Sequence, residues 1–174
     1  MCKSSTGVGA KSHKTFKEKE MRRSPLVIID VQKDYSVKPA MVTRLVKHVR
    51  AARKSQVPVL IVELSGQGPT DPTVMQELAG YDKVKVVQKR DCDGSREVVS
   101  ALGPNGHKRL RLCGLFTDDC VDKTAKGLYR KGFDIEIVEE ACFSYRDCHK
   151  RQVAQWEAKK EFRVMYKGKD WRPL

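Results

Sequence analysis

Two long runs of apolar, mostly β-branched residues constrain the fold of this 174-residue chain more than any other feature. The runs are LVIIDV at 26–31 and VPVLIVEL at 57–64. Continuous runs of this kind are typical of strands that are buried on both faces of a parallel sheet. The chain is long enough to bury a core of that sort within one domain.

Shorter patterns complete an alternation of strands and helices. Further strands are predicted at 84–88, 109–114, 133–140 and 162–166. Helices are predicted at 40–55, 73–79, 95–102 (with Ser95 as its cap), 117–130 and 146–160. Strands that alternate with helices predict an α/β fold, a doubly wound three-layer sandwich with right-handed crossovers. We expect a mostly parallel six-stranded sheet, in the common order 3-2-1-4-5-6.

Positive charge gathers at the two ends of the chain. The net charge is +13, of which residues 1–24 and 149–174 carry +5 each. The first segment is predicted to be a basic, flexible arm, compatible with a short helix at 14–22, and the folded domain to span 25–174. Aromatic residues make up 7% and do not interleave with the basic ones. This favours solubility, or a weak salt-sensitive contact with polyanions, over a surface that reads nucleic acid.

The cysteines and the hydropathy indicate a protein of the reducing cytoplasm. No apolar run approaches the ~20 residues needed to cross a bilayer, and MCKSSTGVGAKSHK lacks the apolar stretch of a secretory signal. The six cysteines (2, 92, 113, 120, 142 and 148) have no close pairing or metal-finger spacing, so we expect free thiols. Cys148 beside His149 is a weak metal motif without a second ligand pair. No metal or other cofactor is expected.

The segment LCGLFTDDCVDKTA at 112–125 contains a candidate nucleophile. It is predicted to be the end of a strand, a tight turn at Gly114 and a helix that begins near Thr117. Cys120 then lies in the first helical turn, where unpaired amide groups and the helix dipole favour a thiolate with a pKa below ~8.5. The alternative is a small apolar residue that packs beneath a helix start.

Two more chemically useful residues are predicted on the same edge of the sheet. Asp30 lies near the end of the first strand and Lys89 just after the third, while Cys120 follows the fourth. In doubly wound sheets, ligands bind beyond the carboxyl ends of the strands, where the strand order reverses. The first and third strands would lie roughly 10 Å apart, a gap that a lysine can largely span. The alternatives are that Asp30 caps the strand end and that Lys89 is a surface charge.

Three segments resemble the isochorismatase-like cysteine hydrolases, a family that includes nicotinamidases and N-carbamoylsarcosine amidases. They are VIIDVQKDY, VVQKRD and LCGLFTDDCVDKTA, and the likeness covers about 25–166. The resemblance implies that Asp30, Lys89 and Cys120 form a catalytic triad. Asp30 would take the thiol proton and later give it to a leaving nitrogen, and Cys120 would form a thioester. Lys89 would hold Asp30 and support the thiolate.

The resemblance also implies features around the nucleophile. A cis peptide is expected between Leu115 and Phe116, directing the Phe116 amide, together with that of Cys120, at an oxyanion. The alternative is that Phe116 is simply a residue of the hydrophobic core. Tyr35 and Phe116 are expected to contact the substrate, and the chain is expected to form at least a homodimer.

Departures from the family narrow the expected reaction. Nicotinamidases have an Asp-x-His arrangement and a second histidine after the second strand, and these bind a metal. The corresponding stretch here, VELSGQGPTDP, has no histidine, and the four histidines lie at 13, 48, 107 and 149. Isochorismatases generally lack the cysteine, so Cys120 favours C–N bond chemistry. The loop RDCDGS, with Arg90, Asp91 and Asp93, contains either specificity contacts or solvated side chains.

These observations predict a metal-independent cysteine amidohydrolase that acts on a small amide, ureide or carbamoyl compound. Two alternatives remain open. One is a catalytically inactive or regulatory binding protein that keeps the pocket. The other is a hydrolase of a nucleotide-derived small molecule, for which basic residues would attract phosphate.

Overall fold

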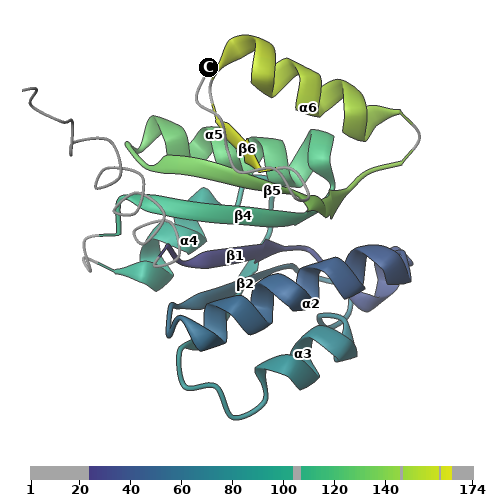
Figure 1. Cartoon of the computed structure of the whole chain (residues 1–174), viewed down its shortest axis with the longest axis vertical. Coiled ribbons are helices and arrows are strands. Elements are labelled where there is room, and N and C mark those ends of the chain that lie inside the picture. The colour runs from purple at the N-terminus through teal and green to yellow at the C-terminus, as the bar shows by residue number, and fades with distance from the viewer. Residues whose placement is uncertain (1–23, 104–106, 146, 161, 166–174) are drawn as a thin grey trace, which may run out of the picture.

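Six parallel strands form one sheet in the order β3-β2-β1-β4-β5-β6, which confirms the predicted strand order. The computed structural model describes residues 24–103, 107–145, 147–160 and 162–165 (Figure 1). The strands are β1 (Leu26–Ile29), β2 (Val59–Leu64), β3 (Val84–Lys89), β4 (Arg109–Leu115), β5 (Asp134–Phe143) and β6 (Arg163–Met165). The predicted arm at 1–24, with its helix at 14–22, lies outside the described residues except for Ser24.

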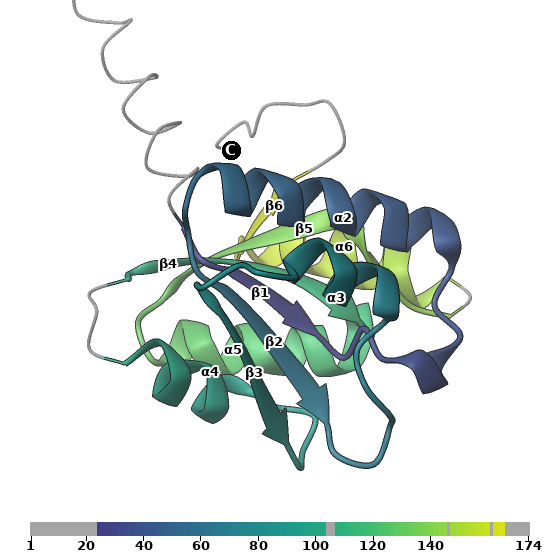
Figure 2. The ribbon, with the colours of Figure 1, turned by 90° about the horizontal axis from the view of Figure 1, so that it is seen from below.

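Helices cover both faces of the sheet and confirm the three-layer arrangement. Figure 2 shows α2 (Pro39–Lys54) and α3 (Pro72–Leu78) on one side, and α4 (Ser95–Leu102) and α5 (Asp122–Arg130) on the other. The last helix, α6 (Cys148–Lys159), is joined to α5 by hydrogen bonds. Among the residues that the structure describes, no helix combines the length and the apolar character that crossing a bilayer requires.

The core follows from the apolar runs. All four residues of β1 are 0% exposed, because β2 and β4 flank the strand and helices cover it. In α2, four apolar residues at helical spacing are buried, as the sequence pattern predicted: Val42, Leu45, Val46 and Val49. Met41 and Ala52 are buried as well. Burying each such valine, leucine or methionine side chain stabilises the fold by about 1.5–3 kcal/mol before entropy is counted.

Strands β1 and β4 approach closely at the edge where the candidate site lies. Gly114 of β4 pairs with Ile29 of β1, and a Cβ at Gly114 would lie 2.0 Å from the Ile29 carbonyl oxygen. Its φ of +125° is also outside the range that other residues adopt readily. Only glycine fits here. Asp30, the residue that follows β1, itself has a φ of 51°.

Three local predictions need correction. The tight turn predicted at Gly114 is wrong, because Gly114 lies within β4 and pairs with Ile29 of β1. The segment 117–130 is not one regular helix, because it begins with a π-helical turn, η2 (Thr117–Val121), before α5. The predicted cap at Ser95 is wrong. Ser95 is the first residue of α4, and its amide donates to Asp93 Oδ1 at 2.8 Å, so the aspartate two residues earlier accepts the free amide.

The side chain of Asp122 anchors α6. Its Oδ1 accepts hydrogen bonds from Trp156 Nε1 at 2.8 Å and Gln152 Nε2 at 3.0 Å, while Oδ2 accepts one from Lys126 Nζ at 2.7 Å. Trp156 is 0% exposed. Since a buried indole N–H needs an acceptor, Asp122 fixes α6 against α5.

Candidate active site

Asp30 and Lys89 form a buried ion pair at the carboxyl edge of the sheet. Asp30 follows β1 and Lys89 is the last residue of β3, and Lys89 Nζ lies 2.8 Å from Asp30 Oδ2. Each side chain is 1% exposed. The lysine therefore spans the width of β2, which separates β3 from β1, as the sequence analysis anticipated.

The loop after β3 holds Lys89 in this position. Lys89 Nζ also donates to the carbonyl oxygens of Asp91 at 3.0 Å and Cys92 at 3.4 Å. Gly94 leaves room for the lysine stem, since a Cβ there would lie 2.9 Å from Lys89 Cδ. The ammonium group is thus surrounded by acceptors, which is what a buried cation requires.

Cys120 lies in η2, and its thiol interacts with both Asp30 and Lys89. Burial raises the pKa of Cys120 far above its ordinary value, and the Asp30 carboxylate raises it further, while Lys89 opposes the shift. The prediction of a lowered thiol pKa was therefore wrong. The helix start is present, but Cys120 is 3% exposed, and desolvation of a thiolate outweighs the favourable dipole.

The pKa values of the ion pair are shifted in the same direction. Burial raises the pKa of Asp30, and the hydrogen bonding and charge of Lys89 offset this only in part. Burial lowers the pKa of Lys89, but Asp30 outweighs it and the net shift is upward. The Lys89 ammonium group, 2.8 Å from Asp30 Oδ2, thus provides the charge that a buried carboxylate requires.

These shifts favour proton transfer within the group over loss of a proton to solvent. Lys89 as ammonium, Asp30 as carboxylate and Cys120 as thiol sum to zero charge. Moving the thiol proton to Asp30 keeps that sum at zero, whereas losing it to water leaves a buried negative charge. A raised pKa of Cys120 toward solvent is therefore compatible with a thiolate formed internally.

The peptide bond between Leu115 and Phe116 is cis, at the position expected from the sequence. The Phe116 carbonyl accepts the amides of Asp119 at 3.0 Å and Val121 at 3.1 Å, which closes the turn around Cys120. The use of the Phe116 and Cys120 amides as an oxyanion hole stays a prediction.

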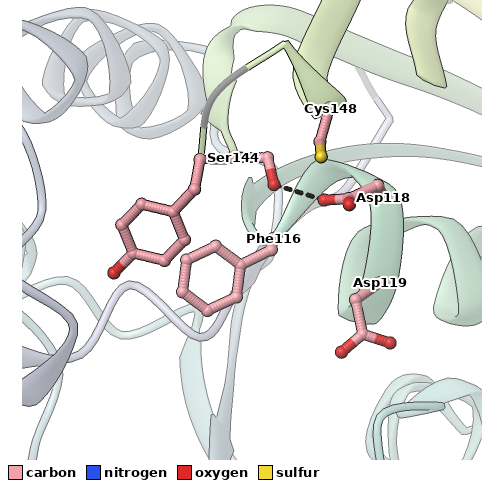
Figure 3. A pocket seen from close by; sticks show the side chains of 6 residues that line it. Phe116, Asp118, Asp119, Ser144 and Cys148 are labelled. Carbon is pink, nitrogen blue, oxygen red and sulfur yellow. Dashed lines mark hydrogen bonds between the residues drawn. The ribbon is translucent and has the colours of Figure 1, made fainter. Parts of the chain in front are cut away.

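A pocket of about 620 Å³ lies beside the turn that follows β4 (Figure 3). Its lining comes from the turn after β4 and from the β5–α6 connection: Phe116, Asp118, Asp119, Ser144, Tyr145 and Cys148. Ser144 Oγ donates a hydrogen bond to Asp118 Oδ1. Asp30, Lys89 and Cys120 are not among the lining residues, but Cys120 Sγ lies within 4.8 Å of a carboxylate oxygen of Asp119, which is one of them. The candidate nucleophile is therefore close to the pocket without lining it.

Aromatic rings form one wall of this region. Tyr35 of η1 (Lys33–Tyr35) contacts Phe116 edge to face at a centroid distance of 5.1 Å, and Phe116 lies 5.0 Å from Tyr145. Burial, together with negative charge at Asp30 and Cys120, raises the pKa of Tyr35 to about 12. Tyr35 is therefore near the triad and supports Phe116, although Tyr35 is not among the lining residues.

Several supporting residues were not predicted. Gln32 organises the loop after β2, because its amide nitrogen donates to the carbonyls of Leu64 at 3.0 Å and Gly68 at 2.6 Å, and its oxygen accepts the Leu64 amide at 2.8 Å. Thr124 ties the loop after β3 to α5, since its hydroxyl accepts the Gly94 amide at 3.0 Å. Thr124 and Ala125 end the segment LCGLFTDDCVDKTA. Membership of that segment was the one sequence feature that could have indicated a role for Thr124.

The loop after β2, where the resemblance to nicotinamidases would place metal ligands, contains no histidine. Glu63 accepts the amide and hydroxyl of Thr70 through one oxygen, at 2.9 and 2.7 Å, and so closes the loop after β2 on itself. His48 contacts Glu140 at 2.9 Å, and His149 lies between Thr117 and Glu139, at 2.8 Å from each. The residues after β2 do not fit a metal ion of that type.

Comparisons with known proteins identify the family of this chain. The model of the isochorismatase domain matches residues 24–167. The isochorismatase domain-containing protein 2 of Xenopus laevis is 30% identical over 138 residues, which is 71% of this chain. This chain spans 62% of the length of that relative.

Solved structures share the fold at low sequence identity. A nicotinamidase from Staphylococcus aureus superimposes with a TM-score of 0.72 at 16% identity, covering 82% of this chain and 99% of the nicotinamidase. An octameric hydrolase of unknown specificity from Escherichia coli gives 0.69 at 16% identity, covering 83% of this chain and 76% of that protein. With the family model covering nearly all of the described residues, the chain belongs to the isochorismatase domain family.

Proposed function

We propose that the protein is a metal-independent cysteine hydrolase that cleaves the C–N bond of a small amide, ureide or carbamoyl compound. The observation that carries the proposal is the buried Asp30–Lys89 ion pair, which interacts with the Cys120 thiol beside a pocket. A buried ion pair contributes little to stability compared with apolar side chains of similar size, so a chemical role is the better reason for one here.

The first half of the reaction forms a thioester. Asp30 takes the proton of Cys120 as Sγ attacks the substrate carbonyl carbon, and the carbonyl oxygen acquires negative charge. The amides of Phe116 and Cys120 stabilise that oxygen. The tetrahedral intermediate collapses, the C–N bond breaks, and protonated Asp30 gives its proton to the leaving nitrogen.

The second half returns the enzyme to its starting state. Asp30 accepts a proton from water as the water oxygen attacks the thioester carbon. The C–S bond then breaks, the product leaves as a carboxylic or carbamic acid, and the proton on Asp30 returns to Sγ. Lys89 stays protonated throughout and prevents the carboxylate and the thiolate from being buried without a compensating charge.

The pocket favours a compact substrate with a flat face. Its volume of about 620 Å³ is within the range of small-molecule sites, and Phe116 with Tyr145 offers aromatic surface for stacking. Asp118 and Ser144 add polar atoms to the lining of the pocket, suited to hydrogen-bond donors on the substrate.

A panel of small amides, ureides and carbamoyl compounds tests the proposal, with ammonia or amine release as the readout. We expect hydrolysis by the wild-type protein and loss of it in Cys120→Ala and Asp30→Asn. Asp82→Asn, at an exposed position, is the matched control for the change at Asp30. Trapping with hydroxylamine should yield a hydroxamate from the wild type alone. Release that survives Cys120→Ala contradicts the covalent route.

One observation favours a second candidate, a non-catalytic binding protein. Cys120 is 3% exposed and its thiol pKa is raised, which are also properties of a structural cysteine. That candidate predicts slow alkylation of Cys120, comparable to that of buried Cys113, whereas the hydrolase predicts selective alkylation by a small amide-like reagent that fits the pocket. The expected homo-oligomer stays a prediction, tested by sedimentation analysis.

A further inference from the structure

Three metal-ligand atoms from two loops meet beside the triad. The Sγ atoms of Cys92 and Cys120 and a carboxylate oxygen of Asp119 all lie within 4.8 Å of one another. Cys92 belongs to the loop after β3, and the other two residues belong to η2. Cys92 and Asp119 are half-buried, so the group is accessible from outside although Cys120 is buried.

The group has the composition and nearly the spacing of a zinc site. Thiolate and carboxylate ligands hold Zn²⁺ at about 2.3 and 2.0–2.2 Å, which in a tetrahedron places the donor atoms on the order of 3.5 Å apart. The three atoms therefore need to move together by roughly 1 Å at most, a shift that side-chain rotation supplies.

We propose that Cys92, Cys120 and Asp119 bind a thiophilic divalent cation of the Zn²⁺ class, with its fourth position open to water. This site is distinct from the stretch after β2 that holds the metal in nicotinamidases. The binding does not depend on the proposed hydrolase activity. Its consequence for catalysis, that the ion occupies the Cys120 Sγ and blocks attack on substrate, rests on the proposed function.

Existing contacts hold the ligands in place before an ion arrives. Cys92 Sγ donates to Asp119 Oδ2 at 3.4 Å, so a cation would replace the proton already shared by two of the three ligands. The Cys92 backbone is fixed because its carbonyl accepts Lys89 Nζ and Thr124 Oγ1, each at 3.4 Å. The Asp119 carboxylate is oriented by Lys123, whose Nζ lies 2.6 Å from Oδ1.

The charges around the site fit a divalent ion. Two thiolates and one carboxylate contribute three negative charges. With the two positive charges of the ion, the net charge of the site is −1. Lys123 lies against Asp119 and offsets that remainder, while Lys89 is already paired with Asp30. The ion takes the place of the two thiol protons. Its positive charge lowers the free-energy cost of burying the sulfur atoms as thiolates.

Titration with Co²⁺ tests the site directly, because thiolate-to-cobalt charge-transfer absorption reports the number of sulfur ligands. The wild type should bind one Co²⁺ with an intensity typical of two thiolates, and Zn²⁺ should displace it. Cys92→Ser and Cys120→Ser should each lose about half of the intensity. Each should also bind at least about tenfold more weakly, because losing a ligand costs no less than losing an outer group that orients one. Asp119→Asn should weaken binding without changing the sulfur count. Cys148→Ser alters a half-buried cysteine outside the group and is the matched control for Co²⁺ binding alone, with the absorption intensity and affinity of the wild type expected.

Failure of this inference can be told from failure of the proposed function. Charge-transfer absorption that is absent, or that persists unchanged in Cys92→Ser, overturns the metal site even if the protein hydrolyses amides. Conversely, a two-thiolate spectrum in a protein without hydrolase activity supports the metal site and contradicts the proposed hydrolase function. If both proposals hold, Zn²⁺ should inhibit hydrolysis by the wild type. The Zn²⁺ concentration that halves the activity of Cys92→Ser should be at least about tenfold higher.

Discussion

Lys89 Nζ lies 2.8 Å from Asp30 Oδ2, with both side chains 1% exposed. The two residues are 59 positions apart in the chain and belong to strands that are not neighbours in the sheet. Their pairing therefore depends on the strand order. We expect changes to the pair to alter both the reactivity of the site and the free energy of unfolding.

Replacing Lys89 by methionine keeps the stem but removes the charge. The buried Asp30 carboxylate then has no cation, and we expect a loss of about 3–5 kcal/mol in the free energy of unfolding together with loss of hydrolysis. Chemical denaturation measures the first. Lys85→Met, on an exposed position of the same strand, is the control. The double variant with Asp30→Asn should recover much of the stability and no activity. If it is as unstable as the single variant, uncompensated charge is not the cause.

Gly94→Ala tests the space around the lysine stem. The added Cβ would lie 2.9 Å from Lys89 Cδ and 3.0 Å from Val62 Cγ1, so the lysine has to shift. We expect a cost of about 1–3 kcal/mol and a fall in kcat of at least about tenfold, because the ion pair is displaced. Gly80→Ala provides the comparison. It meets no atom within 4 Å but is strained by its positive φ, so stability should fall while kcat is kept. Equal effects of both changes on kcat would contradict this account.

Asp122→Ala should loosen α6. The change leaves the buried indole N–H of Trp156 without its acceptor, and we expect a loss of about 2–4 kcal/mol, monitored by tryptophan fluorescence during urea unfolding. Lys126→Met removes only the partly exposed partner of the same carboxylate and should cost less than about 1 kcal/mol. A larger loss for the lysine variant would show that the ion pair, rather than the indole contact, anchors the helix.

The stability should fall in mild acid because of His48. Burial lowers the pKa of His48 below its ordinary 6.5, although Glu140 opposes this, while Arg111 and Lys47 add to it. A lowered pKa means that the unfolded chain binds the proton more tightly, so the stabilisation is present above pH 6.5 and is lost as the pH falls through the folded pKa. His48→Gln should give a flatter dependence of the free energy of unfolding on pH below 6.5. Parallel curves for the two proteins would refute the assignment.

Much of the site could be predicted because its positions follow from strand order. Asp30 and Lys89 terminate or follow strands that the apolar runs reveal, and parallel strands bring their carboxyl ends to one edge. The local chemistry was harder to predict. The pKa of Cys120 depends on how completely loops cover the thiol, and a position at a helix start does not indicate that burial.

Residues that support the site through side-chain contacts left little trace in the sequence. Gln32 holds the loop after β2 by three hydrogen bonds, yet a glutamine after a strand resembles any exposed polar residue. Cys92 was one of six cysteines without regular spacing, and only the fold places it beside Cys120. Asp93 rather than Ser95 caps α4, because an aspartate two residues before the amide can compete with a serine at the helix start.

The pocket and the triad are built from different parts of the chain. Asp30 and Lys89 come from β1 and β3, whereas Ser144, Tyr145 and Cys148 come from the connection between β5 and α6. Exchanging that connection for one of another shape should therefore change which molecules are accepted while leaving the reactive group intact. Selectivity and reactivity could then diverge separately among descendants of one ancestral gene.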